Sequence, residues 1–374
     1  MTENIEEKNG KNLLRDRSPV QRRHAPTYLL ITLLSFAFSV TATRIFLNLT
    51  GFPKIGNGDL HIAHVLWGGL FLFVASLLPL IFVNQWALDF SALFAGIGVG
   101  LFIDEVGKFI TSTNNYFFPS AAPIIYAFFL LTVLVYEQVR QQRKRTSREE
   151  MYSILEDFAE VLDRDLSEIE RKQMISQLEA IIEKNEYPEL VKLAKNLKAV
   201  LWRKQNILVP HEPDLIEHIQ AVWSKFESHW FTRARMRTTI IIGLLLWAAW
   251  ATTSQVIMYL ATHNTQQVQI LLNQFMANNL IRNASGMNWF EAQIILEGFM
   301  GIFSLVAVFF FIFKKETIAT WIGSLDLVIT LVFVNLITFY FDQFSTIAFA
   351  AVQFLLLVIL LMYRRKYIKI KIEK

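Results

Sequence analysis

The chain has 374 residues, of which 53% are apolar and 18% are charged, whereas soluble domains carry roughly 25% charged residues. It contains no cysteine, which excludes disulfide scaffolds, iron–sulfur ligation, cysteine-based zinc sites and cysteine nucleophiles. The net charge of +4 is small, so the placement of the basic residues matters more than their number. This composition predicts an all-α, multi-pass membrane protein.

Eight apolar segments are long enough to cross a hydrocarbon core about 30 Å thick, which takes roughly 17–25 helical residues. They are rich in Leu, Ile, Phe and Val without polar alternation, which favours helices over barrel strands. The predicted spans are 27–48, 62–83, 86–110, 119–138, 238–261, 291–313, 318–340 and 343–363. We therefore expect a basic tail (1–26), four spans (27–138), a polar insert (139–237), four further spans (238–363) and a second basic tail (364–374).

Lys and Arg concentrate in the segments that eight spans place on one side of the membrane. These segments are the N-terminal tail, 140–148, 233–237, 314–315 and 364–366. Because positively charged loops stay in the cytoplasm, we expect both termini and the insert to be cytoplasmic, in a bacterial plasma (inner) membrane. Seven or nine spans would place basic clusters on both sides.

The polar insert is expected to be a small bundle of about four helices. The capping-box pattern S/T-x-x-E begins at Ser147 and again at Ser167, and Pro188 suits a first helical turn. A fourth helix is expected from Asp214 into the fifth span. Apolar residues recur at helical spacing after each start, and Leu155 is expected in the core. The insert has no phosphate loop, zinc spacing or catalytic signature, and its mixed charges argue against nucleic-acid binding.

Ionisable residues inside membrane spans are rare and costly, so each one is a candidate for function. Six of them are expected near the outer ends of four different spans: Arg44, His61, His64, Asp104, Glu105 and Glu297. Asp326 is isolated in the inner half of the seventh span. Since the topology was assigned without these residues, their convergence predicts one buried polar site in the outer leaflet.

The histidine pair suggests a metal site. His61 and His64 are three residues apart, so a helix presents them on one face. A catalytic zinc site typically takes three protein ligands and keeps one position open for water. Asp104 would complete the ligand set, and Asp104 or Glu105 would serve as the catalytic base.

The same residues also fit two other interpretations. Asp104 with Lys108, and Glu105 with Arg44, would form structural ion pairs that join helices. Alternatively, the acidic groups would conduct protons or ions. In any of these cases, a carboxylate oxygen of Asp104 or Glu105 should lie within about 4–6 Å of a histidine ring nitrogen.

The third span and the loop after it bear on how this site is built. Gly96-x-x-x-Gly100 matches the small-xxx-small packing pattern, and sequence adjacency favours the second span as its neighbour. The following loop, 111–119, contains Asn115 and Tyr116. It would either cover the polar site or anchor its aromatic side chains at headgroup level.

The block from residue 61 to residue 126 resembles a group of uncharacterised bacterial multi-pass membrane proteins. In that group, a His-rich helix start precedes a Gly-rich helix that ends in an acidic pair of the I-D-E-x-G-K-F type. The matching residues are His61, His64, Gly96, Gly98, Gly100, Asp104, Glu105, Gly107, Lys108, Phe109, Asn115, Tyr116 and Pro119. Some members have consecutive histidines, whereas two residues separate them here. The resemblance implies family membership and brings no activity with it.

Three functions fit these features. A metal-dependent hydrolase, using zinc or another divalent ion, would act on a lipid-like substrate. An ion- or proton-coupled transporter or channel would use Asp104, Glu105, Glu297 and Asp326 as relay groups. A sensor or scaffold would signal from the outer site to the cytoplasmic insert. We expect contact with membrane lipids and none with nucleic acid, and the sequence also allows a protein partner of 139–237 and a homo-oligomer.

Overall fold

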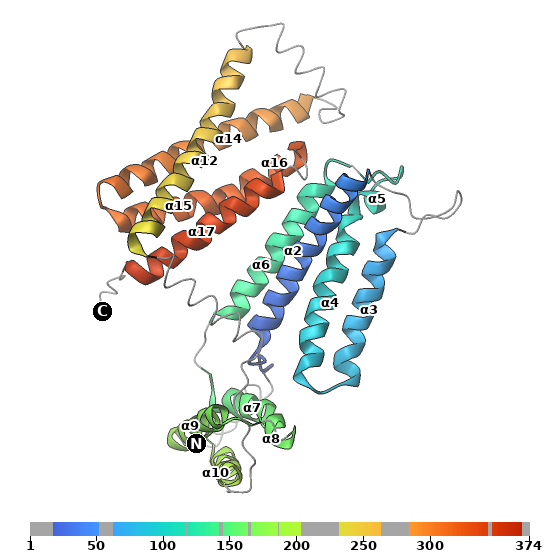
Figure 1. Ribbon diagram of the computed structural model, residues 1–374, viewed down its shortest axis with the longest axis vertical. Coiled ribbons are helices and arrows are strands. Elements are labelled where there is room, and N and C mark those ends of the chain that lie inside the picture. The colour runs from blue at the N-terminus through green and yellow to red at the C-terminus, as the bar shows by residue number, and fades with distance from the viewer. Residues whose placement is uncertain are drawn as a thin grey trace, which may run out of the picture. The chain divides into compact units, whose positions relative to one another are not determined.

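The computed structural model describes residues 18–51, 63–116, 118–141, 145–163, 166–185, 187–202, 232–262, 284–342 and 346–368. Every regular element within these residues is a helix, and eight helices are long and apolar enough to cross a membrane (Figure 1). The predicted all-α fold is confirmed. The chain is a multi-pass membrane protein with a helical insert between its fourth and fifth spans.

The first half of the membrane region contains α2 (Ala25–Thr50), α3 (His64–Ile81), α4 (Gln85–Asp104), α5 (Val106–Ile110) and α6 (Ala121–Arg140). The predicted first, second and fourth spans agree with α2, α3 and α6 to within two residues at each end. The predicted third span, 86–110, is wrong at its C-terminal end, because α4 stops at Asp104 and α5 is a separate short helix.

Small residues bring α4 close to two neighbours. A Cβ on Gly98 would lie 2.8 Å from the carbonyl oxygen of Gly68 in α3, and one on Gly100 would lie 2.8 Å from Cβ of Ser39 in α2. The prediction that Gly100 packs against the second span is therefore wrong: Gly98 faces that span and Gly100 faces the first. Residues two apart point roughly 200° away from each other on a helix, so α4 contacts α3 and α2 on nearly opposite sides.

The insert forms α7 (Ser147–Asp157), α8 (Ala159–Asp163), α9 (Glu168–Lys184) and α10 (Pro188–Leu201). The capping box at Ser167 and Pro188 in the first turn are confirmed. The first box is shifted by one residue, because Thr146 and Glu149 form it. The sequence T-S-R-E-E contains two overlapping boxes, and the pattern does not distinguish between them. The helix expected from Asp214 lies outside the described residues.

The core of the insert differs from the predicted one at Leu155, which is 47% exposed. Ile154 beside it is fully buried, together with Met151 one turn earlier and Leu178 of α9. Adjacent helical residues point about 100° apart, so a shift of the buried stripe by one position removes Leu155 from the core.

The second half of the membrane region contains α12 (Arg233–Thr262), α14 (Ala284–Ile312), α15 (Glu316–Ile329), a π-helical turn η1 (Thr330–Val334), α16 (Asn335–Asp342) and α17 (Ile347–Tyr367). Together α15, η1 and α16 make the seventh span. Leu244 of α12, Ala307 of α14, Leu327 of α15 and Leu360 of α17 are fully buried in one shared apolar cluster.

Arginines just before α2 tie this helix to the insert. Arg22 Nη1 lies 2.9 Å from Glu156 Oε1 of α7, and Arg23 pairs with Asp157. Burial raises the pKa of Asp157, and the charge of Arg23 opposes that rise. The segment before α2 and the C-terminal end of α7 are therefore held together by two ion pairs.

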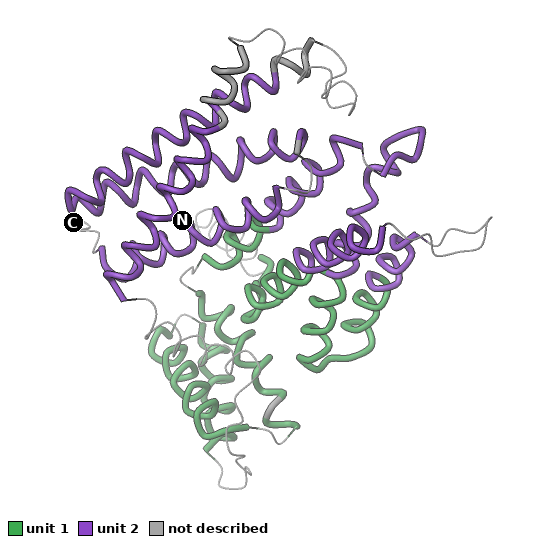
Figure 2. The backbone as a smooth tube through the Cα atoms, turned by 45° about the horizontal axis from the view of Figure 1, so that its top comes forward, with its two compact units in different colours: residues 1–35, 73–96, 133–217 green, residues 36–72, 97–132, 218–374 purple. Residues whose placement is uncertain are grey.

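The chain divides into two compact units, which Figure 2 shows in different colours. One unit comprises residues 1–35, 73–96 and 133–217, and the other comprises residues 36–72, 97–132 and 218–374. Because α2, α3, α4 and α6 each contribute to both units, the division runs across these four helices.

Candidate functional site

The site begins where α4 is interrupted. Arg44 Nη2 donates to the backbone oxygen of Asp104 at 3.0 Å. In a continuous helix this oxygen would accept from the backbone N–H of Lys108, which instead donates to the backbone oxygen of Glu105 at 2.9 Å. An arginine side chain therefore takes the place of a helical hydrogen bond, and the chain turns at Glu105.

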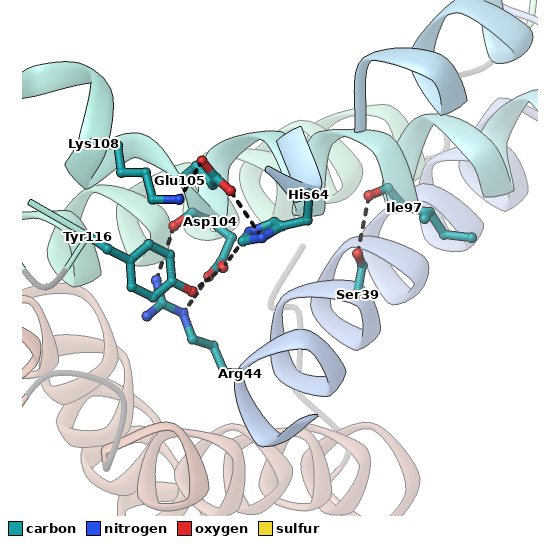
Figure 3. Close-up of polar contacts among 8 residues, drawn as sticks. All are labelled: Ser39, Arg44, His64, Ile97, Asp104, Glu105, Lys108 and Tyr116. Carbon is teal, nitrogen blue, oxygen red and sulfur yellow. Dashed lines mark hydrogen bonds and ion pairs between the residues drawn. The ribbon is translucent and has the colours of Figure 1, made fainter. Parts of the chain in front are cut away.

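Asp104 is the centre of the site and is fully buried. Its Oδ1 lies 2.5 Å from Nε of Arg44, which is itself buried. Its Oδ2 accepts a hydrogen bond of 2.6 Å from the hydroxyl of Tyr116 and lies 3.1 Å from Nε2 of His64. Figure 3 shows these side chains pointing toward one another from α2, α3, the end of α4 and the following loop.

Glu105 extends the network on the other side of His64. Its Oε1 lies 3.0 Å from Nδ1 of His64, and its Oε2 lies 3.1 Å from Nζ of Lys108. Glu105 is 1% exposed, and its Oε1 accepts no hydrogen bond within the described part of the chain. The contact with His64 is therefore an ion pair without hydrogen-bond geometry. We call Arg44, His64, Asp104, Glu105, Lys108 and Tyr116 the ion-pair cluster.

These distances confirm one prediction and correct another. Both carboxylates lie within the predicted range of a histidine ring nitrogen. The predicted ion pairs are exchanged, however, because Lys108 pairs with Glu105 and Arg44 pairs with Asp104. The break after Asp104 replaces the predicted i,i+4 pair with an i,i+3 pair.

Tyr116 covers the cluster. Its ring centroid lies 4.1 Å from Cζ of Arg44 and 5.3 Å from Nζ of Lys108, and its ring meets His64 edge-on at 6.2 Å. Burial, together with the charge of Asp104, raises the pKa of Tyr116, so the phenol remains a hydrogen-bond donor. Of the two roles considered for the loop, contact with the site is the one that Tyr116 adopts.

Gly107 allows the loop to pack this closely. A Cβ on Gly107 would lie 2.8 Å from the carbonyl oxygen of Asn115 and 3.0 Å from that of Tyr116. The backbone N–H of Asn115 donates to Oγ1 of Thr111 at 2.8 Å, which closes the loop on itself. Asn115 therefore holds the backbone that positions Tyr116.

The protonation of His64 determines the charge of the cluster. Arg44 and Lys108 balance Asp104 and Glu105, so the cluster is neutral with neutral His64 and carries +1 with the imidazolium. A neutral imidazole has one N–H and one bare nitrogen, whereas an imidazolium donates from both nitrogens. Both ring nitrogens lie about 3 Å from a carboxylate oxygen, so the positive charge of the imidazolium would be attracted by both acids.

The described residues of the cluster are not arranged to hold a divalent metal ion. Among the described residues, no three His, Cys, Asp or Glu side chains are grouped so that they could hold one. Both nitrogens of His64 already face carboxylates, and Arg44 and Lys108 would repel a second cation. His61 lies outside the described residues, so its predicted role as a ligand stays a prediction.

Glu297 forms hydrogen bonds within the C-terminal helices, and its predicted place in the outer-leaflet site stays a prediction. It lies in α14, where its Oε1 accepts hydrogen bonds from Nε2 of Gln293 at 2.9 Å and from Oγ1 of Thr338 at 3.3 Å. Gln293 and Thr338 were not singled out from the sequence. The spacing of four residues between Gln293 and Glu297 is the available signal, since it puts both on one helical face.

The fold and this site define a multi-pass α-helical membrane protein with a buried ion-pair cluster of two acids, two permanent cations and one histidine. Comparisons with protein-family models, curated proteins and solved structures find no match. The resemblance of residues 61–126 to uncharacterised bacterial membrane proteins therefore stays a prediction.

Proposed function

We propose that this protein is a membrane proton sensor in which His64 is the switch and the helical insert is the output. The single observation that carries the proposal is the position of the His64 ring, about 3 Å from both buried carboxylates. The Lys and Arg distribution supports a bacterial plasma membrane with cytoplasmic termini, and thus an ion-pair cluster in the outer leaflet. His64 is 21% exposed, so its ring is not fully enclosed by the protein.

Losing one proton changes the forces inside the cluster. With the imidazolium, His64 attracts Asp104 and Glu105 at once and holds α3 against the end of α4. With neutral His64, one ring nitrogen presents a lone pair to a carboxylate oxygen, and that contact becomes repulsive. We therefore expect α3 to shift relative to α4 when the outside becomes alkaline.

Helix α2 provides the link to the insert. Arg44 lies about 28 Å from the start of α2, at 1.5 Å per residue, which is close to the thickness of a hydrocarbon core. Arg22 and Arg23 precede the same helix and pair with Glu156 and Asp157 of α7. A displacement of α2 at Arg44 would therefore reach the insert through one continuous helix, which supports a sensor over a hydrolase.

Two substitutions of His64 should lock the sensor in opposite states. His64→Gln keeps the site neutral and His64→Lys keeps it charged, so both should abolish the pH response of the insert. The chain has no native cysteine, so a single cysteine at Leu162, which is 80% exposed, can carry an environment-sensitive fluorophore. In proteoliposomes, we expect the wild-type signal to change with external pH.

The two locked variants should give the two extreme wild-type signals: the alkaline value for His64→Gln and the acidic value for His64→Lys. Leu66→Gln on the same helix, at a position that is 64% exposed, is the matched control and should keep the response. An unaltered pH response in His64→Gln would contradict the proposal.

The orientation can be tested with the same cysteine-free chain. A membrane-impermeant maleimide added to intact cells should label a cysteine at Asn57 and should fail to label one at Leu162. Leu162 serves better than Ser153, which is 6% exposed and would resist labelling on either side of the membrane. External labelling at Leu162 would reverse the proposed orientation.

A further inference from the structure

A second acidic group lies in the C-terminal helices, outside the ion-pair cluster. Asp326 of α15 is fully buried, and the hydroxyl of Ser304 in α14 donates to its Oδ2. Its Oδ1 accepts no hydrogen bond from any described residue. Thr330, four residues further along the same helical face, is also fully buried, and its hydroxyl has no described partner. Asp326 therefore has unused hydrogen-bonding capacity in a buried position.

The surroundings of Asp326 are apolar. A Cβ on Gly323, which lies three residues before Asp326, would touch Leu360, Leu244 and Ala307, and Leu327 beside Asp326 is fully buried. An ionised carboxylate buried without a counter-charge costs several kcal/mol. The described contacts of Asp326 include Ser304 and no cation.

The titratable groups on the neighbouring helices bind partners other than Asp326. Glu297 of α14 lies seven residues from Ser304, about 10 Å along the helix, and binds Gln293 and Thr338. At the beginning of α12, Arg233 pairs with Glu316 at 2.8 Å. Arg237 of α12 donates to the backbone oxygen of Phe311 at 2.6 Å. Two tyrosines, Tyr363 of α17 and Tyr126 of α6, also lie on neighbouring helices. Tyr126 donates to the backbone oxygen of Leu331 at 2.7 Å.

The helix changes its winding about one turn after Asp326. The π-helical turn η1 starts at Thr330, and the backbone N–H of Asn335 donates to the oxygen of Thr330. A π-turn inserts one residue into the helical register and often occurs at functional sites. Asn335, at the end of the π-turn, is buried, and its Nδ2 donates to Oε1 of Gln353 at 2.7 Å.

Further buried polar side chains lie along the same helices. Thr330 follows Asp326 on one face, and Thr338, beyond the π-turn, bonds to Glu297. These residues come from α14, α15, η1 and α16, which all lie in the same compact unit.

We propose that Asp326 is a proton-binding site of the C-terminal helices, in which the hydroxyl of Ser304 donates to one carboxyl oxygen and the other oxygen, Oδ1, carries the proton. The site is separate from the ion-pair cluster and does not depend on the sensor function. Through this site, the last four spans bind a proton independently of the ion-pair cluster.

The full-length protein in proteoliposomes can be tested with dicyclohexylcarbodiimide, which reacts with protonated carboxyl groups in apolar surroundings. The expected result is one adduct on the peptide that contains Asp326, which mass spectrometry detects at neutral pH and which decreases as the pH rises. Asp326→Asn should remove this adduct. Glu291→Gln, at an exposed position of α14, is the matched control and should leave it unchanged.

Infrared difference spectroscopy gives a second readout that needs no reagent. A protonated Asp326 should show a carboxylic C=O band that is absent in Asp326→Asn. In Ser304→Ala, the band should move to higher frequency, because the hydroxyl no longer donates to the carboxyl group. The absence of both the band and the adduct in folded wild-type protein would overturn the proposal. Protection of Asp326 by Na⁺ at constant pH would also overturn it, in favour of a metal-cation site.

Discussion

Arg44→Ala should lower the free energy of unfolding by about 3–5 kcal/mol, which is the usual cost of removing one partner from a buried ion pair. Asp104 is fully buried, and Arg44 contacts both its carboxylate and its backbone oxygen. Without Arg44, the carboxylate loses its permanent counter-charge, and the turn at Glu105 loses the donor that replaces a helical hydrogen bond. Reversible unfolding of the purified protein in mixed detergent micelles would measure the loss.

Arg140→Ala is the matched control for this measurement. Arg140 also pairs with a glutamate, Glu137, but the two side chains are 46% and 53% exposed. Exposed ion pairs contribute roughly 0–1 kcal/mol, so we expect a loss within that range. Arg44→Met combined with Asp104→Leu should restore much of the stability, because it removes both buried charges together. Equal losses for Arg44→Ala and Arg140→Ala would contradict a buried ion pair.

Ile154→Asp should unfold the insert, whereas Leu155→Asp should leave it folded. Ile154 is fully buried between α7 and α9, and an unpaired charge there costs several kcal/mol in a small core. Leu155 is 47% exposed, so an aspartate at that position stays in water and should change stability by about 0.5 kcal/mol at most. Circular dichroism of residues 145–230 expressed alone would measure helix content and thermal unfolding.

This comparison tests both the fold of the insert and its helical register. The two substitutions introduce the same side chain at adjacent positions, so helix propensity and net charge change almost equally. The difference between them therefore reports burial alone. If Leu155→Asp unfolded the fragment and Ile154→Asp did not, the buried stripe would lie one residue further along α7.

The eight spans were predictable because span formation depends on local composition. A run of about 20 apolar residues satisfies its backbone hydrogen bonds within one helix, whatever packs against it. The closeness of His64 to Asp104 and Glu105 was predictable for a related reason. Depth in the membrane follows from residue count along each span, and two adjacent spans with polar residues at equal depth bring them together.

The local sequence defines some helix starts of the insert and leaves others ambiguous. Ser167 and Pro188 each have one available register and were predicted correctly. Two overlapping capping boxes exist near Thr146, and the structure uses the earlier one. Similarly, Ile154 and Leu155 have the same hydrophobic character, and their burial depends on how α7 is rotated toward α9.

The partners within the ion-pair cluster were decided by tertiary structure alone. Sequence spacing paired Asp104 with Lys108 on the assumption of a continuous helix, but Arg44 reaches across from α2, binds the backbone oxygen of Asp104 and interrupts that helix. Likewise, Glu297 is oriented by the rotation of α14 toward Thr338. Local sequence determined which segments are helices and how deep each charge lies. The rotation of each helix about its own axis determined which charges meet, and that rotation is set by contacts between residues far apart in the chain.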